Sequence, residues 1–262
     1  MPTIHHSAVV EKGASLAENV TVGPFSLVGS GVVLEAGVVL HSHVVVVGNT
    51  RVGERTEIFP FASIGHSPQD LKFRGEESRL DIGSDNRIRE YVTINPGTEG
   101  GGMVTKLGNG CLLMAGAHIA HDCVVGDHVI MANNATLAGH VHVGDHAIFG
   151  GLSAVHQHVR IGPHAMIGGM SGVTHDVIPY GAVMGAHASL SGLNLIGLRR
   201  RGFPREDIDH LRQAYELLFQ DEGTFADRLL QVETALGTSP PVRSLLKFIG
   251  AQSSRGVLTP KA

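Results

Sequence analysis

The chain of 262 residues has no tryptophan, only two cysteines and few aromatic residues. Two cysteines exclude a disulfide-stapled scaffold and fit a reducing compartment. No apolar stretch reaches the 18 residues of a transmembrane helix, and the first 20 residues lack a basic start followed by an apolar run. We therefore expect a cytoplasmic protein without a membrane span. An apolar content of 42% excludes a disordered chain.

Charge is also scarce, at 17% of residues with a net value of −4. Nothing in this balance suggests a nucleic-acid partner. The distribution is uneven, because residues 190–262 hold ten basic and eight acidic residues and so carry +2, whereas the rest carries −6. This asymmetry indicates an acidic partner for the C-terminal part.

An apolar residue recurs at every sixth position along most of the chain. The series runs through residues 4–64, resumes over 82–94 and continues in a third register over 107–173. A period of six is neither the 3.6-residue period of a helix nor simple alternation. We interpret each hexad as a short strand and a turn, with three hexads closing a triangular coil. Residues 18 apart then stack at the parallel-strand spacing of about 4.8 Å.

The composition of the hexads supports this reading. Turn residues follow many apolar positions, as in Val125-Gly126-Asp127, and the apolar positions are rich in valine and isoleucine. A β-sandwich would instead repeat every 8–12 residues with irregular loops. We therefore predict an all-β fold with an α-helical tail, in which residues 1–189 form a parallel β-helix.

Two insertions and a tail interrupt the repeat. A polar segment occupies about residues 65–81 and a glycine-rich one about residues 95–106. Insertions in solenoids loop out from one face, often the binding face. After residue 190 the period stops, and capping signals predict helices beginning near Pro204, Thr224 and Pro241. Residues 190–262 are therefore expected to form a helical domain that closes one end of the solenoid.

One cluster of polar residues is a candidate for catalysis. Eleven of the 17 histidines fall between His118 and His187, and His121 is followed directly by Asp122. In a coil of 18 residues, Gly139 and Gln157 stack above His121, while His140 and His158 stack above Asp122.

This set of groups suits proton abstraction and acyl transfer. An anionic neighbour fixes the tautomer of a histidine base and stabilises its charged form. The Gly139 N–H, one coil above, is placed to meet an oxyanion. No serine or cysteine nucleophile accompanies the pair, so we favour direct transfer without a covalent intermediate.

Several motifs resemble a known family. The hexads are similar to those of hexapeptide-repeat transferases, whose β-helix is left-handed. HIAHDC at 118–123, ANNATLAGHV at 132–141, GGLSAVHQ at 150–157, QDLKFRGE at 69–76 and NLIGLRRRGF at 194–203 resemble the acyl-[acyl-carrier-protein]–UDP-N-acetylglucosamine O-acyltransferases. The resemblance implies transfer of an (R)-3-hydroxyacyl chain from acyl carrier protein to the 3-position of UDP-N-acetylglucosamine, the first step of lipid A biosynthesis.

The resemblance also assigns residue roles. It implies that His121 is the general base, Asp122 its orienting partner and the Gly139 N–H the oxyanion donor. The implied substrate contacts are Asp70 and Lys72 at the sugar and acyl donor, His118, His140, His156 and Gln157 along the site, Asn194, Arg200 and Arg201 at the diphosphate, and Gly169 and His187 at the far end of the acyl groove. It implies a homotrimer with sites between adjacent prisms, and no cofactor or metal.

Three departures from the family pattern leave details open. Asn95-Pro96 stand where a His-Arg pair is familiar, and Ile196 where an acidic residue is often seen. These two changes leave a 3-amino sugar acceptor as an alternative to the 3-hydroxyl. Met170 follows Gly169 where a smaller residue is common, which leaves the acyl chain length open.

Other functions remain as alternatives. The histidines suggest a metal-dependent lyase of the γ-carbonic-anhydrase type, which requires His118, His121 and His140 to converge on one ion. A non-catalytic scaffold is disfavoured by the His-Asp cluster and the two insertions. The N-acyltransferase that acts later in the same pathway usually carries an extra N-terminal domain, for which hexads beginning at Ile4 leave no room.

Overall fold

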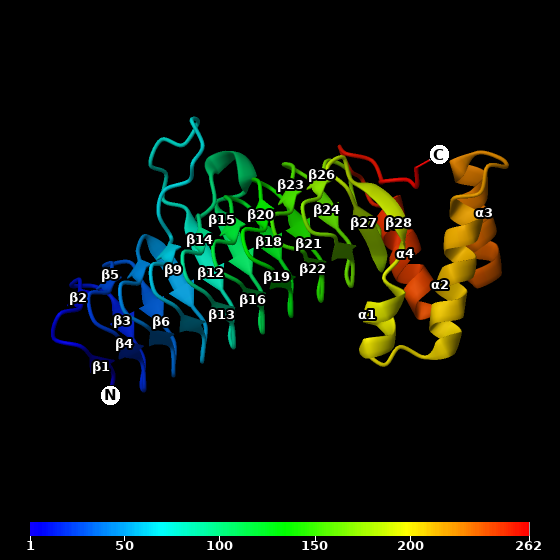
Figure 1. Ribbon diagram of the computed structural model, residues 1–262. Coiled ribbons are helices and arrows are strands. Elements are labelled where there is room, and N and C mark those ends of the chain that lie inside the picture. The colour runs from blue at the N-terminus through cyan, green and yellow to red at the C-terminus, as the bar shows by residue number, and fades with distance from the viewer. Residues whose placement is uncertain (262) are drawn as a thin grey trace.

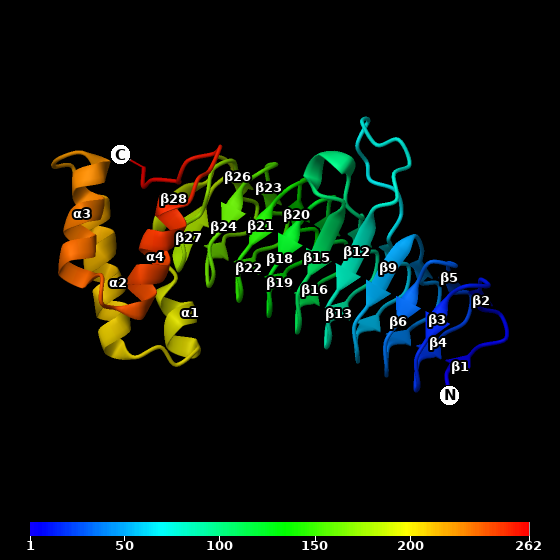
Figure 2. The ribbon, with the colours of Figure 1, turned by 180° about the vertical axis from the view of Figure 1, so that it is seen from behind.

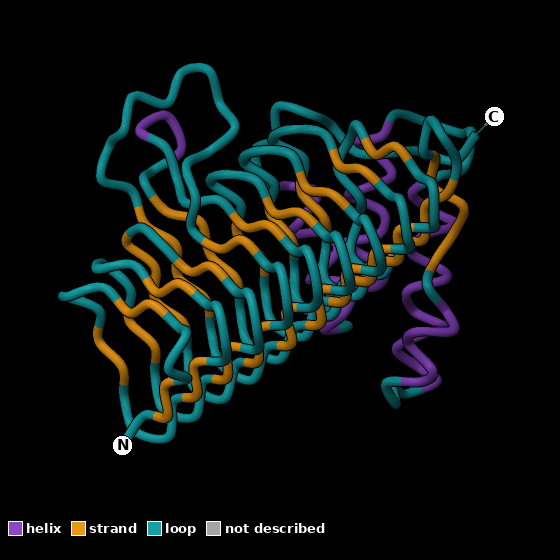
Figure 3. The backbone as a smooth tube through the Cα atoms, turned by 60° about the vertical axis from the view of Figure 1, so that its left-hand side comes forward, coloured by secondary structure: helices purple, strands orange, loops and turns teal. Residues whose placement is uncertain are grey.

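The hexads form short strands that wind into a left-handed parallel β-helix, with helices at its C-terminal end (Figure 1). The coordinates are a computed structural model, which describes residues 1–261. Each coil contributes one strand to each of three sheets, which are parallel apart from one antiparallel pair at the C-terminal end. The sheets are the faces of a triangular prism (Figure 3). The predicted fold class is confirmed.

The three faces are named here A, B and C after the order in which the chain visits them. Face A consists of β1 (Thr3–Ile4), β4 (Thr21–Val22), β7 (Val39–Leu40), β10 (Glu57–Ile58), β13 (Arg87–Ile88), β16 (Leu112–Leu113), β19 (Ile130–Met131), β22 (Ile148–Phe149), β25 (Met166–Ile167), β27 (Gly181–Met184) and β28 (Ser189–Leu193). Face B consists of β2 (Val9–Val10), β5 (Leu27–Val28), β8 (Val45–Val46), β11 (Ser63–Ile64), β14 (Thr93–Ile94), β17 (His118–Ile119), β20 (Thr136–Leu137), β23 (Ala154–Val155) and β26 (Gly172–Val173). Face C consists of β3 (Ser15–Leu16), β6 (Val33–Leu34), β9 (Asn49–Val52), β12 (Arg79–Ile82), β15 (Val104–Leu107), β18 (Val124–Val125), β21 (His142–Val143) and β24 (Arg160–Ile161).

Strand pairing keeps one register through both insertions. Ile119 pairs with Leu137, 18 residues later, as the repeat predicts. Across the insertions the partners are further apart in sequence, with Ile64 opposite Ile94 and Ile94 opposite Ile119. The extra residues loop out from one edge of the prism, so the coils above and below them still stack (Figure 3).

The core is the column of hexad residues inside the prism. Aliphatic side chains such as Leu34, Ile94 and Leu137 are fully buried there, and each adds about 2 kcal/mol of burial free energy. The first coil differs from the prediction, because Ile4 is 45% exposed. No coil of the described chain lies beneath it, so its inward face meets solvent.

Each corner contains a residue with left-handed backbone geometry. At the corner between faces B and C these residues are Asp122, His140 and His158, with φ of 60°, 62° and 63°. Non-glycine residues rarely adopt this conformation. The corner therefore fixes these three side chains in one ladder, one coil apart.

Four helices follow the last strand and cover the C-terminal end of the prism (Figure 2). They are α1 (Leu195–Arg200), α2 (Arg205–Leu218), α3 (Phe225–Leu236) and α4 (Pro240–Gly250). The three predicted starts are confirmed, and Thr224 forms a reciprocal capping box with Asp227 at the start of α3. The short helix α1 was not predicted, because six residues show too little periodicity. None of the helices within residues 1–261 has the length and apolar character needed to cross a membrane.

Candidate functional site

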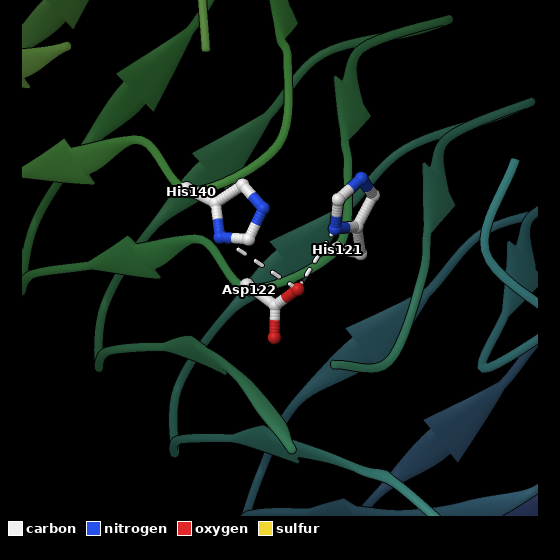
Figure 4. A group of neighbouring side chains, drawn as sticks. All are labelled: His121, Asp122 and His140. Atoms are coloured by element: carbon white, nitrogen blue, oxygen red, sulfur yellow. Dashed lines mark hydrogen bonds and ion pairs between the residues drawn. The ribbon is translucent and has the colours of Figure 1, made fainter. Parts of the chain in front are cut away.

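His121 and Asp122 lie at the corner between β17 and β18. The Nδ1 of His121 is 2.8 Å from Oδ2 of Asp122, and the side chains are 7% and 0% exposed. Asp122 therefore accepts the Nδ1–H of His121, which leaves Nε2 without a proton. Figure 4 shows the carboxylate between the rings of His121 and His140.

The glycine-rich insertion holds Asp122 in place. Thr98 donates its main-chain N–H to Oδ1 at 2.8 Å and its hydroxyl to Oδ2 at 2.5 Å. The Thr105 hydroxyl accepts the Asp122 N–H at 2.7 Å. A Cβ added to Gly101, in the 3-10 helix η1 (Glu99–Gly101), would overlap the Asp122 carboxylate. The insertion is glycine-rich here because its backbone covers the carboxylate directly.

Gly139 lies directly above His121, as the 18-residue spacing predicts. A Cβ at Gly139 would lie 2.5 Å from Cε1 of the His121 ring, so any side chain would displace the imidazole. The Gly139 N–H has no acceptor within residues 1–261. This corner thus combines a base with an unpaired main-chain donor one coil away.

Two further histidines line the same corner. The His140 ring stands edge-on to His121, with centroids 5.0 Å apart at 90°, and its Nδ1 is 3.8 Å from Oδ2 of Asp122. His118 is half-buried and shares a hydrogen bond of 2.7 Å between Nδ1 and the Thr93 hydroxyl. Burial lowers the pKa of both His118 and His140, because desolvation disfavours the charged ring. Both rings are therefore neutral near pH 7.

The cluster of His121, Asp122 and His140 has the donor atoms of a metal site but a poor geometry for one. One nitrogen or oxygen of each residue lies within 4.8 Å of the others, whereas His118 lies outside the group. Asp122 already accepts hydrogen bonds from Thr98 and His121 on both oxygens. The three-histidine convergence that a lyase of the γ-carbonic-anhydrase type requires is thus not the arrangement found here.

The polar insertion approaches this corner from the neighbouring coils. Asp70 accepts the Lys72 N–H at 3.0 Å. Burial lowers the pKa of His140, and the negative charge of Asp70 opposes that shift weakly. Asn95 is buried and donates to the carbonyls of His66 and Ser67 at the base of the insertion. The residue that departs from the family pattern therefore anchors the insertion containing Asp70 and Lys72.

The residues expected at the diphosphate lie at a different corner. Asn194 caps α1 by accepting the Gly197 N–H and also donates to the carbonyl of His164. Arg201 donates to the carbonyl of His146 at 2.8 Å, and Arg200 is exposed. His146 and His164 belong to the corner between faces C and A. Face C separates these residues from His121 within one chain.

The remaining predicted residues lie on the surface of the later coils. His156 and Gln157 are exposed above the His121 corner, and Gly169 is exposed at the corner between faces A and B. His187 is exposed in the turn between β27 and β28. Met170, beside Gly169, is 73% exposed.

Sequence reasoning missed Thr98 and Thr105. Both contact Asp122 from the second insertion and the strand that follows it. The run of glycines in the insertion was the available signal, because such residues mark close backbone approach. The contact itself depends on how the loop folds back onto the corner.

Chemically, the corner offers a buried base, a carboxylate that orients it and a free main-chain N–H. Such groups can remove a proton from a hydroxyl and stabilise negative charge on a carbonyl oxygen. No cysteine is available as a nucleophile, because Cys111 and Cys123 are buried and burial raises their thiol pKa to about 11 and about 12.

Comparison with known proteins gives matches over the whole chain. Residues 105–139 match the bacterial transferase hexapeptide family, and residues 176–258 match domain 2 of the UDP-N-acetylglucosamine O-acyltransferase family. Acyl-[acyl-carrier-protein]–UDP-N-acetylglucosamine O-acyltransferases of Azorhizobium caulinodans and Caulobacter vibrioides are each 52% identical, over 98% and 99% of this chain and 95% and 98% of theirs.

Solved structures agree in fold along the full length. LpxA from Acinetobacter baumannii superimposes with a TM-score of 0.94 at 45% identity, covering 97% of this chain and 99% of that one. UDP-N-acetylglucosamine acyltransferase from Campylobacter jejuni gives 0.93 at 36% identity, covering 99% and 100%. From its repeat, its corner geometry and these relatives, the chain belongs to the acyl-[acyl-carrier-protein]–UDP-N-acetylglucosamine O-acyltransferase family.

Proposed function

We propose that this protein transfers an (R)-3-hydroxyacyl chain from acyl carrier protein to the 3-hydroxyl of UDP-N-acetylglucosamine, opening lipid A biosynthesis. The observation that carries the proposal is the buried His121–Asp122 pair beneath the free N–H of Gly139. The names of the relatives support the same substrates. We place the reaction in the cytoplasm, in keeping with two free, buried cysteines.

His121 performs both proton transfers of the reaction. Its Nε2 takes the proton from the 3-hydroxyl as the sugar oxygen attacks the thioester carbonyl carbon. Asp122 stabilises the imidazolium that results, through the hydrogen bond at Nδ1. The carbon–sulfur bond then breaks, and His121 returns the proton to the departing thiolate of the carrier protein.

Gly139 stabilises the tetrahedral intermediate between these steps. The carbonyl oxygen becomes negatively charged when the sugar oxygen adds, and the Gly139 N–H donates to it. A donor of this kind contributes about 3 kcal/mol to transition-state stabilisation. The neutral rings of His118 and His140 line the same corner and contact the substrate without adding charge.

We further propose a homotrimer whose sites lie between adjacent prisms. Arg200, Arg201 and Asn194 lie across face C from His121, so one chain does not bring the nucleotide residues to its own base. The corner between faces A and B supports such an assembly, since it carries two groups of exposed large side chains. Phe25, Phe61 and Tyr91 lie on the earlier coils and Leu152 and Met170 on the later ones, and each is 49% or more exposed. Exposed apolar groups of this kind are typical of a surface covered by another subunit.

The acyl carrier protein is the acidic partner that the charge distribution predicts. Residues 190–262 carry a net +2, and Lys72 and Arg74 lie exposed on the polar insertion. Opposite charge accelerates the encounter of two proteins and orients them. Weaker transfer from carrier protein at high ionic strength is the expected consequence.

A direct assay tests the proposed reaction. The purified chain is incubated with (R)-3-hydroxyacyl carrier proteins of different chain length and with UDP-N-acetylglucosamine or its 3-amino analogue. We expect acyl transfer to the 3-hydroxyl sugar at one preferred chain length, and no loss of rate with a metal chelator. Transfer only to the 3-amino sugar would show that the proposed acceptor is wrong. Hydration of carbon dioxide that the chelator abolishes would show that the protein is a metal-dependent lyase and not an acyltransferase.

A mixing experiment tests the shared site. His121→Ala and Arg200→Ala are each expected to reduce activity strongly when expressed alone. If each site takes His121 from one subunit and Arg200 from its neighbour, random co-assembly restores about one quarter of the sites. Activity no higher than that of the separate variants, in trimers shown to contain both, would reject a site built from two subunits.

A further inference from the structure

A pair of stacked histidines adjoins the proposed catalytic pair. The rings of His140 and His158 are nearly parallel, with centroids 4.4 Å apart and an interplanar angle of 8°. The His140 ring in turn meets His121 edge-on. The family resemblance assigns no role to His158, although the repeat places it in the ladder of Asp122 and His140.

Asp122 is the group for which His121 and His140 compete. Its Oδ2 is 2.8 Å from Nδ1 of His121 and 3.8 Å from Nδ1 of His140. If His140 turned toward the carboxylate or gained a proton, it would pair with the same oxygen. Asp122 would then orient His121 less firmly. The proposed base therefore depends on His140 remaining edge-on and neutral.

Some of the groups around His140 raise its pKa and others lower it. Burial is the largest influence and lowers its pKa, whereas the Asp122 carboxylate raises it. His158 and His121 lower the pKa further, and Asp70 on the polar insertion raises it. Arg255 reaches the same coil, where it donates to the carbonyl of Gln157, the residue before His158, at 2.8 Å. His158 is thus the one stacked neighbour that also opposes protonation of His140.

We propose that His158 is a positioning residue for the acyl transfer, whose stacked ring holds His140 edge-on to His121 so that Asp122 serves His121 alone. This inference rests on the proposed function of His121 as the general base. Parallel aromatic rings at this separation attract each other, and the contact restricts rotation of the His140 ring. His158 itself touches neither His121 nor Asp122.

Two variants of His158 separate the effect of its stacked aromatic face from the effect of its ionisable imidazole. His158→Phe keeps a flat aromatic face over His140, and His158→Ala removes it. At pH 8 we expect His158→Ala to lower kcat about fivefold with KM for both substrates changed less than about twofold, and His158→Phe to stay within about twofold of wild type. His142→Ala is the matched control, because His142 is exposed on β21 and lies outside the site.

A titration provides a readout that needs no turnover. Both His158 variants remove an imidazole that, after burial, lowers the pKa of His140, so the His140 pKa should rise in each. NMR of protein labelled at histidine Cε1 measures this over pH 5–8, and the acid limb of the kcat profile should move to higher pH in parallel. His142→Ala should leave both readouts unchanged.

Three results would overturn the proposal: wild-type kcat in His158→Ala at pH 8, an equal loss in the Phe and Ala variants, or an unmoved His140 titration. Circular dichroism verifies that each variant is folded. A wild-type protein without acyl transfer would instead reject the proposed function, and the titration would then decide alone whether His158 controls His140.

Discussion

His121 Nδ1 lies 2.8 Å from Asp122 Oδ2, although the two residues are neighbours in the chain. Successive side chains of an extended strand point to opposite faces. The left-handed backbone of Asp122, with φ of 60°, turns its side chain back toward His121. The corner of the prism, and not the strand, therefore brings His121 and Asp122 together.

Removing the proposed base should lower turnover strongly and spare the fold. We expect His121→Ala to lower kcat by about 10³-fold, since general-base catalysis accounts for about 10²–10⁴. Acyl transfer measured with saturating substrates, together with a thermal melt, checks this. His6→Ala is the control, because His6 is exposed on the first coil and belongs to neither proposed binding corner. Near wild-type turnover of His121→Ala would reject the assignment of the base.

The Thr98 hydroxyl should matter without touching substrate. Thr98→Val removes its hydrogen bond to Asp122 and retains the bond from the main-chain N–H. Because a hydrogen bond to a charged group contributes about 1.5–3 kcal/mol, we expect kcat to fall about tenfold. The comparison is Thr234→Val on α3, where the hydroxyl bonds only to a helix carbonyl. Equal kcat in the two variants would show that Thr98 does not orient the pair.

A single methyl group at Gly139 should disable the site. The Cβ of Gly139→Ala would lie 2.5 Å from the His121 ring, and the ring has to move away from the proposed position of the attacking hydroxyl. We expect kcat to fall about 100-fold, because displacement of about 1 Å has that effect on a positioned catalytic group. Gly250→Ala, where a Cβ meets nothing within 4 Å, is the control. Unchanged kinetics in Gly139→Ala would mean that the ring is not confined there.

Stability should decrease in mild acid because of His164. This half-buried ring stacks between His146 and Tyr180, and burial, followed by the charges of His146 and Arg201, lowers its pKa to about 4. In the unfolded chain the pKa is about 6.5, so only the unfolded state binds a proton between these values. The free energy of unfolding therefore falls as pH drops from about 6.5 to about 4.

His164→Phe keeps the stack and removes this proton uptake. Between pH 7 and pH 5 we expect the melting temperature of both proteins to fall. The fall should be about 2–4 °C smaller in the variant than in wild type. Differential scanning calorimetry measures both proteins, and His6→Phe at the exposed N-terminal coil serves as the control. Identical pH dependence in wild type and His164→Phe would contradict the assignment.

The part of the candidate site that lies on the regular coils could be predicted from the repeat. Counting in steps of 18 places Gly139 above His121 and His140 above Asp122, and the structure has them there. Thr98 was not predictable in this way, because it lies in an insertion that the repeat does not describe. Its contact with Asp122 requires the loop to fold over the corner.

The sequence by itself determined the architecture of the prism and the start of the three longer helices. Coils of three hexads bury the apolar residue at every sixth position. Thr224 and Pro204 mark helix starts, because a capping hydroxyl and a proline each favour the first turn of a helix. Only the tertiary structure decided that Thr98 of the insertion donates hydrogen bonds to both carboxylate oxygens of Asp122. It also decided that α1 lies across face C from His121 and that Ile4 remains exposed. These features depend on contacts between segments distant in sequence, for which no local pattern selects the partner.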